Sequence, residues 1–406
     1  MSHKKVDRWF IESLLDIDLY KITMLQAFYH AAEFRLTTVQ WKFACRNKEG
    51  LNLAPLVPEI QKQLEHLCTL SFTDPELEYL AELSYLKPDF IEFLRMFKLN
   101  TKFIQLESDG DDINLRFEGP LLHVSLFEIY TLSIISELHT EFNCGGFDLS
   151  VARDRLASKI ALLKSEGDLS DFHFMDFGTR RRASKAWQEE VLTTLKKELP
   201  DSFVGTSSVH FARTLTIPAL GTMAHEWFQS WQAVTRLADA QKAALEGWVR
   251  EYRGQLGVAL TDCYSMDSFV RDFNDPYFGK LYDGLRHDSG CPFIWGEKAI
   301  ALYQSMDIDP LNKTLVFSDA LDFPRMIEIW KRFRGRVKVS FGIGTNLMND
   351  VGNIPLSIVI KMVSVNGKPV AKISDEPGKS MCDDLGYLQY LASQYGIEPS
   401  TVKAAK

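Results

Sequence analysis

Residues 172–207 read FHFMDFGTRRRASKAWQEEVLTTLKKELPDSFVGTS, and this stretch indicates the class of fold. Its first six residues are a short run rich in strand-forming residues, with the length of a strand. An apolar stripe at i,i+4 spacing then predicts an amphipathic helix that ends at Pro200, and a second strand-like run covers residues 203–207. The stripe comprises Ala183, Trp187, Val191, Leu195 and Leu199. A strand, a helix and a second strand in this order are typical of a parallel α/β unit.

The same alternation continues toward the C-terminus. Further strand-like runs cover residues 217–222, 257–264, 284–288, 314–319, 338–344 and 356–365, and helical patterns such as 296–306 and 322–335 follow most of them. This number of units favours a closed barrel over an open sheet, and their uneven spacing predicts an irregular one. We therefore expect residues 146–365 to form an irregular, TIM-like parallel α/β barrel that carries the active site.

The first 145 residues lack this alternation. Strand-like runs at residues 38–45 and 113–117 stand among helical patterns, of which one begins at Ser13 and another, broken one covers residues 75–97. These residues are predicted to form a separate N-terminal α/β domain. We expect the last strand, residues 368–374, and the tail to fold back onto it, so that segment 366–406 joins residues 1–145.

The composition of the 406 residues argues against several classes of protein. The 46 basic and 54 acidic side chains give a net charge of −8, which is not typical of a dedicated nucleic-acid binder. The most apolar run, residues 121–138, contains Glu128 and predicts a buried helix, so no membrane association is expected. Six cysteines lie scattered without a CxxC pair, and no secretion signal is recognised, which together predict free thiols and a cytoplasmic enzyme.

Polar residues follow nearly every strand of the predicted barrel, at the ends where such barrels bind substrates. Small hydroxyls, glycines, aspartates and arginines recur there, and these residue types suit phosphates and sugar hydroxyls. An alternative is that loops after strands are polar in most proteins. The loops are residues 176–182, 205–208, 221–226, 261–267, 285–290, 317–322 and 341–346.

Two of these loops indicate anion binding. The three arginines at 180–182 precede a helix, where each positive charge opposes the helix macrodipole by about 0.3–1 kcal/mol, and a bound anion would offset this. The alternative is a solvated basic turn. Gly342, Gly344 and Thr345 form a glycine-rich turn that suits a phosphate, although an ordinary tight turn explains it equally well.

Titratable residues at strand ends are the candidates for chemistry. His225 follows the run 217–222 at the end where the site is expected, which favours a functional role, although a lone histidine is more often structural. Asp262, Asp288 and Asp319 also stand at strand ends. They could bind ribose hydroxyls or a magnesium ion that bridges phosphates, or they could only cap helices. No metal-ligand motif predicts a resident metal site.

Together, the motifs resemble the bacterial nicotinate phosphoribosyltransferase family, in order, from about residue 13 to about residue 380. They are residues 15–24 (LDIDLYKITM), 175–182 (MDFGTRRR), 205–207 (GTS), 221–226 (GTMAHE), 260–263 (LTDC), 285–290 (LRHDSG) and 339–345 (VSFGIGT). The resemblance implies the fold of type II phosphoribosyltransferases, in which an N-terminal α/β domain accompanies an irregular α/β barrel.

The resemblance also implies an activity. The family transfers ribose 5-phosphate from phosphoribosyl pyrophosphate to nicotinate, giving nicotinate mononucleotide and pyrophosphate in the salvage route to NAD. ATP hydrolysis is coupled to the transfer through a phosphohistidine, which would be His225. Mg²⁺ would accompany ATP and phosphoribosyl pyrophosphate, without a tightly bound organic cofactor. The expected assembly is a homodimer in which Tyr20 reaches the site of the neighbouring subunit.

The family's residue roles carry over motif by motif. Phe177 and Tyr20 would sandwich the pyridine ring, and Arg286 would bind the nicotinate carboxylate. Asp262 and Asp288 would hold ribose hydroxyls and stabilise charge at the anomeric carbon. The other matches are Thr206 and Ser207 for the substrate, Arg180 and its neighbours for phosphate groups, and Ser318, Asp319, Gly342, Gly344 and Thr345 for the 5′-phosphate.

Two positions bear on the substrate and on activity. Relatives that use nicotinamide have aspartate where this chain has Ser207, and because a carboxylate would repel nicotinate, Ser207 favours the acid. The family usually reads His-Asp-Ser-Gly-Asp-Pro, whereas Cys291 stands here in place of the second aspartate. That acid either assists magnesium or phosphoribosyl pyrophosphate, or only caps a turn. The alternatives are therefore a catalytically silent or regulatory relative, and a phosphoribosyltransferase for nicotinamide or quinolinate.

Overall fold

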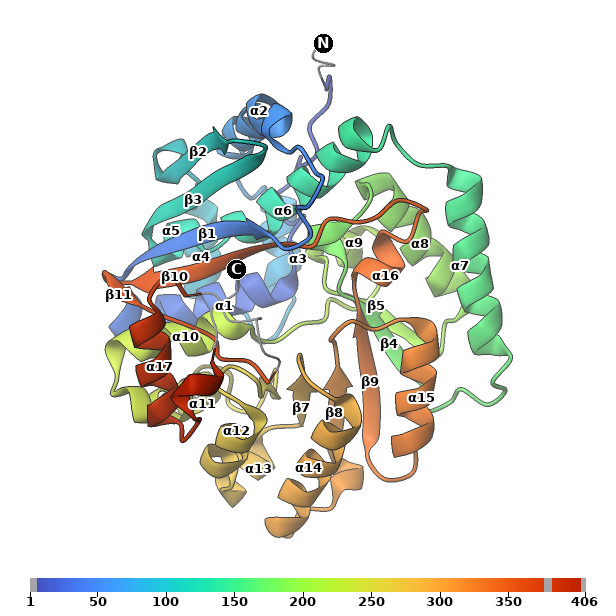
Figure 1. Ribbon diagram of the computed structural model, residues 1–406. Coiled ribbons are helices and arrows are strands. Elements are labelled where there is room, and N and C mark those ends of the chain that lie inside the picture. Colours follow the sequence, from blue (N-terminus) through green and yellow to red (C-terminus); the bar gives the residue numbers. More distant parts are fainter. Residues whose placement is uncertain (1–5, 376–381, 403–406) are drawn as a thin grey trace.

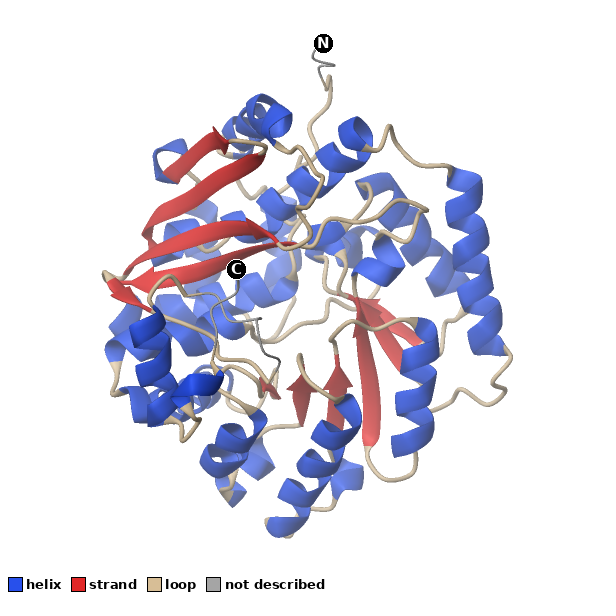
Figure 2. Ribbon diagram, viewed as in Figure 1, coloured by secondary structure: helices blue, strands red, loops and turns tan. Residues whose placement is uncertain are grey.

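Two β-sheets organise the molecule, and helices surround them (Figures 1 and 2). The computed structural model describes residues 6–375 and 382–402. One sheet has six strands in the order β5-β4-β9-β8-β7-β6, and its adjacent strands pair in parallel. The other has five antiparallel strands in the order β11-β10-β1-β3-β2. The predicted α/β fold class is confirmed.

The parallel sheet follows the predicted alternation of strands and helices. In helix α8, Trp187, Val191 and Leu195 of the predicted stripe are buried, and the helix ends at Glu198, just before Pro200. The strands are β4 (His173–Asp176), β5 (Phe203–Thr206), β6 (Val258–Leu260), β7 (Gly284–His287), β8 (Thr314–Phe317) and β9 (Lys338–Ile343). The helices around them are α7 (Leu149–Lys164), α8 (Lys185–Glu198), α9 (Val209–Thr214), α10 (His225–Val234), α11 (Ala240–Tyr252), α12 (Met266–Phe273), α13 (Pro276–Leu281), α14 (Pro292–Ser305), α15 (Phe323–Phe333) and α16 (Thr345–Met348).

An irregular segment, residues 217–222, lies between the two edge strands β5 and β6. The Thr206 N–H donates to the Pro218 carbonyl, and the Leu220 N–H donates back to the Thr206 carbonyl. On the other side the Thr222 hydroxyl donates to the Val258 carbonyl over 2.9 Å. The predicted strand at 217–222 is therefore only one isolated bridge. The reason is that Pro218 has no N–H for a ladder, which makes the closure of the barrel irregular.

The antiparallel sheet and its helices come mostly from the N-terminal third. Strand β1 alternates exposed and buried residues, as expected for a strand with one face on a core. The apolar run 121–143 is long enough to span a membrane, but 89% of its most apolar window is buried inside the protein, as predicted for a core helix. The elements are α1 (Leu19–His30), β1 (Thr38–Cys45), α2 (Val57–Leu67), α3 (Asp74–Ala81), α4 (Pro88–Met96), β2 (Ile104–Asp109), β3 (Asp112–Pro120), α5 (Leu121–Val124) and α6 (Phe127–Leu138).

Strand β10 (Ile358–Val365) corrects the prediction that residues 356–365 belong to the barrel. It pairs antiparallel with β1, from Cys45 opposite Ile358 to Val39 opposite Val365, and β11 (Lys368–Pro369) pairs with β10 in turn. The chain therefore crosses to the antiparallel sheet before residue 366. The sequence missed this because an apolar strand does not encode which sheet it joins.

The last described helix, α17 (Leu385–Gln394), packs beside α10 and α11 and not on the antiparallel sheet. The Tyr387 hydroxyl donates to Gln232 Oε1, and the Tyr395 hydroxyl donates to the Leu237 carbonyl. The C-terminal segment thus divides between the two halves of the molecule, whereas we expected all of it on the N-terminal part. Residues 376–381 and 403–406 of that segment lie outside the described residues.

Candidate active site

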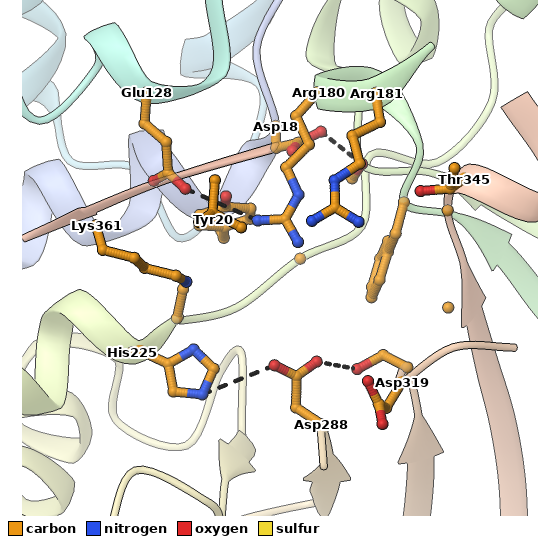
Figure 3. Close-up of a pocket in the computed structure, with 18 of the residues that line it drawn as sticks. Asp18, Tyr20, Glu128, Arg180, Arg181, His225, Asp288, Asp319, Thr345 and Lys361 are labelled. Carbon is orange, nitrogen blue, oxygen red and sulfur yellow. Dashed lines mark hydrogen bonds and ion pairs between the residues drawn. The ribbon is translucent and has the colours of Figure 1, made fainter. Parts of the chain in front are cut away.

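A cavity of about 250 Å³ lies between the C-terminal ends of the parallel strands and the antiparallel sheet. Loops after β4, β5, β7, β8 and β9 form one side, while α1, β1, α6 and β10 form the other. In Figure 3 Arg180 and Arg181 reach into this space from one side, and His225, Asp288 and Asp319 face them from the other. Segments far apart in the chain therefore share one pocket, at the barrel end where the sequence predicted it.

Twelve of the fourteen predicted site residues line this pocket. They are Tyr20, Phe177, Arg180, Ser207, His225, Arg286, Asp288, Ser318, Asp319, Gly342, Gly344 and Thr345. The other two, Thr206 and Asp262, lie behind the lining and contact it through other side chains.

Thr206 is a correction, because it is fully buried and does not reach the cavity. Its hydroxyl donates to Asp176 Oδ2 over 2.7 Å, and Asp176 also accepts from Gln188 and from the Gly178 N–H. Burial raises the pKa of Asp176 to about 6. Thr206 therefore supports the turn after β4 and does not line the cavity, contrary to the prediction.

The three consecutive arginines have different roles. Arg180 lies 3.8 Å from Glu128, and Arg181 donates from Nε to the Ile358 carbonyl. Burial, with Arg180 next to it, lowers the pKa of Arg181 to about 9. Arg180 and Arg181 line the cavity, as expected for anion ligands.

Arg182 does not line the cavity, which corrects the idea that all three arginines hold phosphate. Its side chain is fully buried and donates twice to the Asp16 carboxylate, over 2.7 and 2.9 Å. A third hydrogen bond, over 2.7 Å, goes to Glu137 on α6. Because a buried arginine needs compensating carboxylates, this residue connects α6 and the N-terminal segment to the turn after β4.

Phe177 packs directly against the backbone of β9. A Cβ atom at position 342 would clash with Cδ2 and Cε2 of the Phe177 ring, so only glycine leaves room for the ring there. The glycine that resembled part of a phosphate turn thus also positions an aromatic face in the pocket. Aromatic faces of this kind suit a flat heterocycle.

Tyr20 lies in the pocket of its own chain, whereas we expected it to reach the site of the neighbouring subunit. It is the second residue of α1 and lines the cavity of its own chain, together with Phe177. Figure 3 shows it beside Arg180 and Glu128. The pocket therefore obtains this tyrosine without a second copy of the chain.

Ser207 and Arg286 have polar groups at the pocket. The Ser207 hydroxyl donates to Asp18 Oδ1 over 2.7 Å, and burial raises the pKa of Asp18. Arg286 donates from Nη1 to the Met223 carbonyl over 3.0 Å. Within residues 6–375 and 382–402 its buried Nε has no hydrogen-bond partner, so the guanidinium retains donors for an anion.

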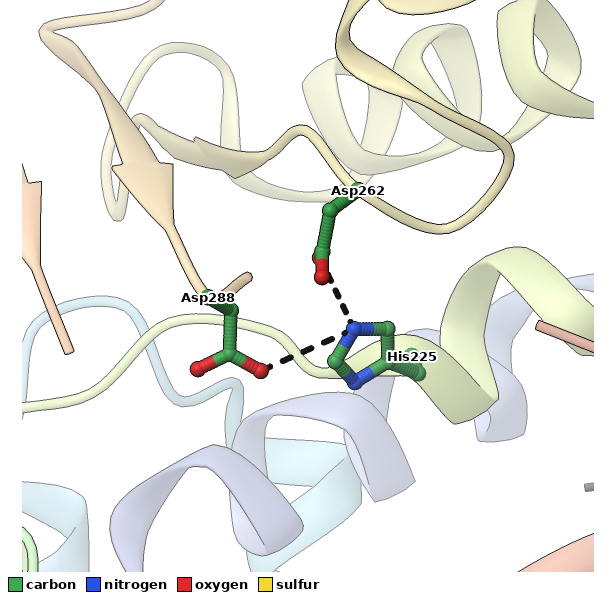
Figure 4. Close-up of side chains that lie close together, drawn as sticks. All are labelled: His225, Asp262 and Asp288. Carbon is green, nitrogen blue, oxygen red and sulfur yellow. Dashed lines mark hydrogen bonds and ion pairs between the residues drawn. The ribbon is translucent and has the colours of Figure 1, made fainter. Parts of the chain in front are cut away.

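His225 is the first residue of α10, and its ring is held from one side. Nε2 lies 2.9 Å from Asp262 Oδ1 and 3.7 Å from Asp288 Oδ2, while Nδ1 is directed away from both aspartates (Figure 4). Burial, with the nearby Lys372 cation, lowers the pKa of His225 to about 4. The ring is therefore neutral near pH 7, with one nitrogen occupied and the other available.

Asp262 is a correction, since it was expected to hold ribose hydroxyls. Its side chain is 1% exposed, and its oxygens accept from His225, from the Ser289 hydroxyl at 2.6 Å and from Lys372 Nζ at 2.5 Å. Three ligand-type atoms of His225, Asp262 and Asp288 lie within 4.8 Å of one another. The Lys372 ammonium opposes a resident cation there, so this cluster does not fit a metal site.

Sequence reasoning missed the lysines of the pocket. Lys361 on β10 and Lys372 after β11 both line it. Lys21 on α1 is buried between Glu128 and Glu226, at 2.6 and 2.7 Å. A lysine inside the apolar run 358–363 was a usable signal for Lys361, and burial lowers its pKa to about 8. Lys372 and Lys21 gave no signal of this kind.

Cys291 occupies the N-cap position of α14 and is exposed. Its side chain makes no capping hydrogen bond, and it is not among the residues that line the cavity. An aspartate at this place would be a helix cap. The geometry therefore favours a capping role for the aspartate that the family usually has here, over a role in binding magnesium or phosphoribosyl pyrophosphate.

Comparisons with known proteins identify the family of this chain. The model of the Nicotinate phosphoribosyltransferase (NAPRTase) family matches residues 172–399, and the model of that family's N-terminal domain matches residues 15–136. The chain belongs to the nicotinate phosphoribosyltransferase family. It is 76% identical to the nicotinate phosphoribosyltransferase of Psychromonas ingrahamii over the full length of both chains. It is 50% identical to that of Cupriavidus necator, covering 96% of this chain and 99% of the relative.

Solved structures of the family share the fold. Nicotinate phosphoribosyltransferase from Vibrio cholerae superposes with a TM-score of 0.92 at 38% identity, covering 98% of this chain and 96% of that one. The enzyme from Porphyromonas gingivalis superposes with a TM-score of 0.89 at 35% identity, covering 95% and 100%. The family and fold implied by the sequence motifs are thus confirmed.

Proposed function

We propose that this protein is a nicotinate phosphoribosyltransferase, which transfers ribose 5-phosphate from phosphoribosyl pyrophosphate to nicotinate in NAD salvage. The observation that carries the proposal is one cavity that contains Phe177, Arg286 and His225. An aromatic face, a guanidinium with unpaired donors and a neutral imidazole suit, respectively, a pyridine ring, a carboxylate and a phosphoryl group. The 76% identity to the nicotinate phosphoribosyltransferase of Psychromonas ingrahamii supports the proposal.

The pyridine ring would lie between Phe177 and Tyr20, with its carboxylate on Arg286. Nicotinate is a weak nucleophile, so the site must supply orientation and electrostatic stabilisation more than acid–base chemistry. Asp288, which accepts a hydrogen bond from Ser318 over 2.9 Å, would face the ribose and stabilise the positive charge that develops at the anomeric carbon. Gly344 and Thr345 would hold the 5′-phosphate at the end of β9, and Arg180 and Arg181 would hold the pyrophosphate.

His225 would carry the phosphoryl group from ATP. With Nε2–H donated to Asp262, the lone pair is on Nδ1. This lone pair would form the N–P bond with the γ-phosphorus, while the bond from that phosphorus to the β,γ-bridging oxygen breaks and its electrons leave on ADP. The ring gains positive charge in this step, and the Asp262 carboxylate stabilises it. No proton has to be transferred in this step, because Nε2 keeps its hydrogen.

Magnesium would enter with ATP and phosphoribosyl pyrophosphate, because Lys372 disfavours a resident ion at His225 and Asp262. When bound, it would neutralise polyphosphate charge, and Asp319 is a carboxylate at the pocket that could hold it. No tightly bound organic cofactor is proposed. A cytoplasmic location fits the free cysteines, and a homodimer stays a prediction of the family resemblance.

The test is an assay of the purified protein with phosphoribosyl pyrophosphate and each of nicotinate, nicotinamide and quinolinate, with and without Mg-ATP. We expect nicotinate mononucleotide as the main product and an acid-labile phosphate on the enzyme from γ-labelled ATP. His225→Ala should lose the label and the stimulation by ATP but keep slow transfer. Arg286→Ala should raise the nicotinate KM at least about tenfold, whereas Arg325→Ala on the surface of α15 should not.

A catalytically silent relative is the competing outcome. It would bind nicotinate, detected by calorimetry, yet form neither product nor phosphoenzyme. Product from nicotinamide or quinolinate at equal efficiency would instead contradict the proposed substrate.

A further inference from the structure

A short strap, residues 370–375, brings a cation to the histidine from a distant part of the chain. It follows β11 and runs past the residues that come after β6 and β7. The Ile373 N–H donates to the Cys263 carbonyl, and the Asp375 N–H donates to the Ser289 hydroxyl. The Asp375 carboxylate in turn accepts from the Met266 N–H. The strap is thus fixed to the same loops that supply Asp262 and Ser289.

Lys372 is the residue that this strap directs inward. Its side chain is 12% exposed, and Nζ lies 2.5 Å from Asp262 Oδ2. The other oxygen of that carboxylate, Oδ1, lies 2.9 Å from Nε2 of His225. The Ser289 hydroxyl also donates to Oδ2. Asp262 therefore connects Lys372 to His225 through a single buried carboxylate, which the Ser289 hydroxyl also contacts.

Helix α10 sets the distance between the two ends of this chain of contacts. His225 is its first residue, and two turns later Gln232 makes two hydrogen bonds to Ala371, one to its N–H and one to its carbonyl. Ala371 is adjacent to Lys372. One helix thus holds both the imidazole and the strap, so the ammonium and the ring keep a fixed register.

We propose that Lys372 is a positioning residue for His225: by balancing the charge of Asp262, it keeps the imidazole neutral with its proton on Nε2 and its lone pair on Nδ1. Burial of the ring also disfavours the imidazolium, and Lys372 adds to this effect. Without the ammonium, the charged groups facing the ring would be Asp262 and Asp288, and two carboxylates favour the imidazolium. An imidazolium has no lone pair with which to accept a phosphoryl group. The inference rests on the phosphohistidine step of the proposed function.

The experiment compares Lys372→Met, Lys372→Gln and Lys372→Arg with Lys368→Met as the matched control. Lys368 stands on the adjacent β11, and its ammonium donates to the Ala233 carbonyl, away from the pocket. The first readout is the ¹⁵N shifts of the His225 ring at pH 7 without nucleotide, assigned by their loss in His225→Ala. The second is the rate of phosphoenzyme formation from saturating labelled Mg-ATP.

We expect a neutral Nε2–H ring in the native protein and in Lys368→Met. Lys372→Met and Lys372→Gln should shift the ring toward the imidazolium and slow phosphoenzyme formation by about 10–100-fold, and Lys372→Arg should restore most of both. Unchanged ¹⁵N shifts in the two neutral variants would overturn the proposal, even if KM for a phosphate substrate rises, because Lys372 would then be only a phosphate ligand.

Two neutral variants, Lys372→Met and Lys372→Gln, are used so that the test does not depend on the folding of one of them. Glutamine retains a hydrogen-bond donor to Asp262, whereas methionine retains only the apolar stem. If the native protein forms no phosphoenzyme, the proposed function fails, but the ¹⁵N shifts still decide whether Lys372 sets the state of the ring.

Discussion

Ser207 and Asp18 form a pair in the pocket: the serine hydroxyl donates to Asp18 Oδ1 over 2.7 Å, and both residues are buried. The position at which nicotinamide-using relatives carry aspartate therefore already contacts a carboxylate in this chain. Ser207 contributes a donor that satisfies Asp18, so the selectivity proposed for Ser207 involves two residues that are far apart in the sequence but in contact in the pocket.

Replacing Ser207 by aspartate should reverse the preference for the acid. Ser207→Asp places two carboxylates in contact and next to the nicotinate carboxylate, and like charges this close disfavour an additional anion. We expect kcat/KM for nicotinate to fall at least about tenfold relative to nicotinamide, which corresponds to about 1.4 kcal/mol. Ser207→Ala is the control, because it removes the donor without adding charge. An unchanged ratio of the two substrates in Ser207→Asp would contradict the role of this pair.

Gly342 should be required for nicotinate binding through the Phe177 ring. Gly342→Ala adds a methyl group where the ring packs, so the ring must move out of its place in the pocket. We expect a rise of about tenfold in the nicotinate KM, with a smaller change for phosphoribosyl pyrophosphate.

A double-mutant cycle separates this effect from damage to β9. Phe177→Leu has a smaller side chain, so adding Gly342→Ala to it should cost much less than adding it to the native protein. Additive effects of the two substitutions on KM would show that the glycine acts independently of the ring.

Arg182 should matter for stability more than for substrate affinity. Arg182→Leu removes the guanidinium from the buried Asp16 and Glu137, and breaking a buried pair in this way costs about 3–5 kcal/mol. We expect the urea midpoint to fall accordingly, while KM values of the remaining folded enzyme stay near the native ones. Arg181→Leu should give the opposite result, with raised KM for phosphate substrates and little loss of stability.

The lowered pKa of His225 predicts an unusual pH profile. Because the histidine reacts only when neutral and its pKa is about 4, phosphoenzyme formation should stay constant from about pH 8 to about pH 6 and decline only near pH 5 and below. The unfolded chain binds a proton here near pH 6.5, so this residue lowers the stability of the folded state as the pH falls from about 6.5 to 4. The rate of phosphoenzyme formation is measured by rapid-quench labelling with ATP at each pH. A midpoint near pH 6.5 would show that the pKa of His225 is not lowered and would contradict the prediction.

The barrel and its rim could be predicted from the sequence because both depend on local patterns. The stripe of α8, ending before Pro200, and the polar loops after β4, β7 and β9 follow from residue spacing and from the rule that parallel strands present their C-terminal ends together. The family resemblance, which rests on the order of the motifs, also indicated the expected roles of His225 and Phe177. None of these inferences required knowledge of which segments meet across the cavity.

Features that depend on long-range pairing could not be predicted in this way. Strand β10 joins β1, and this pairing brings Lys361 over the site; the strap after β11 brings Lys372 to Asp262. Thr206 and Asp262 were predicted to line the cavity, but both are buried behind its lining. A position at the end of a strand does not show whether the side chain faces the cavity or the layer behind it. The same limit applies to Arg182, whose partners lie on α6 and near the N-terminus.

A substitution at Cys291, the N-cap of α14, distinguishes a structural from a catalytic role for the acid that the family usually has at this position. Cys291→Asp restores a side-chain oxygen that can accept from the first free N–H groups of the helix, and such caps contribute about 1 kcal/mol. We expect higher stability in urea by that amount and unchanged kcat and KM. Cys291→Ser, a weaker change of the same kind, should fall between the two. A rise in kcat or in magnesium affinity with aspartate would instead place this residue in the catalytic machinery and make the native cysteine a cause of reduced activity.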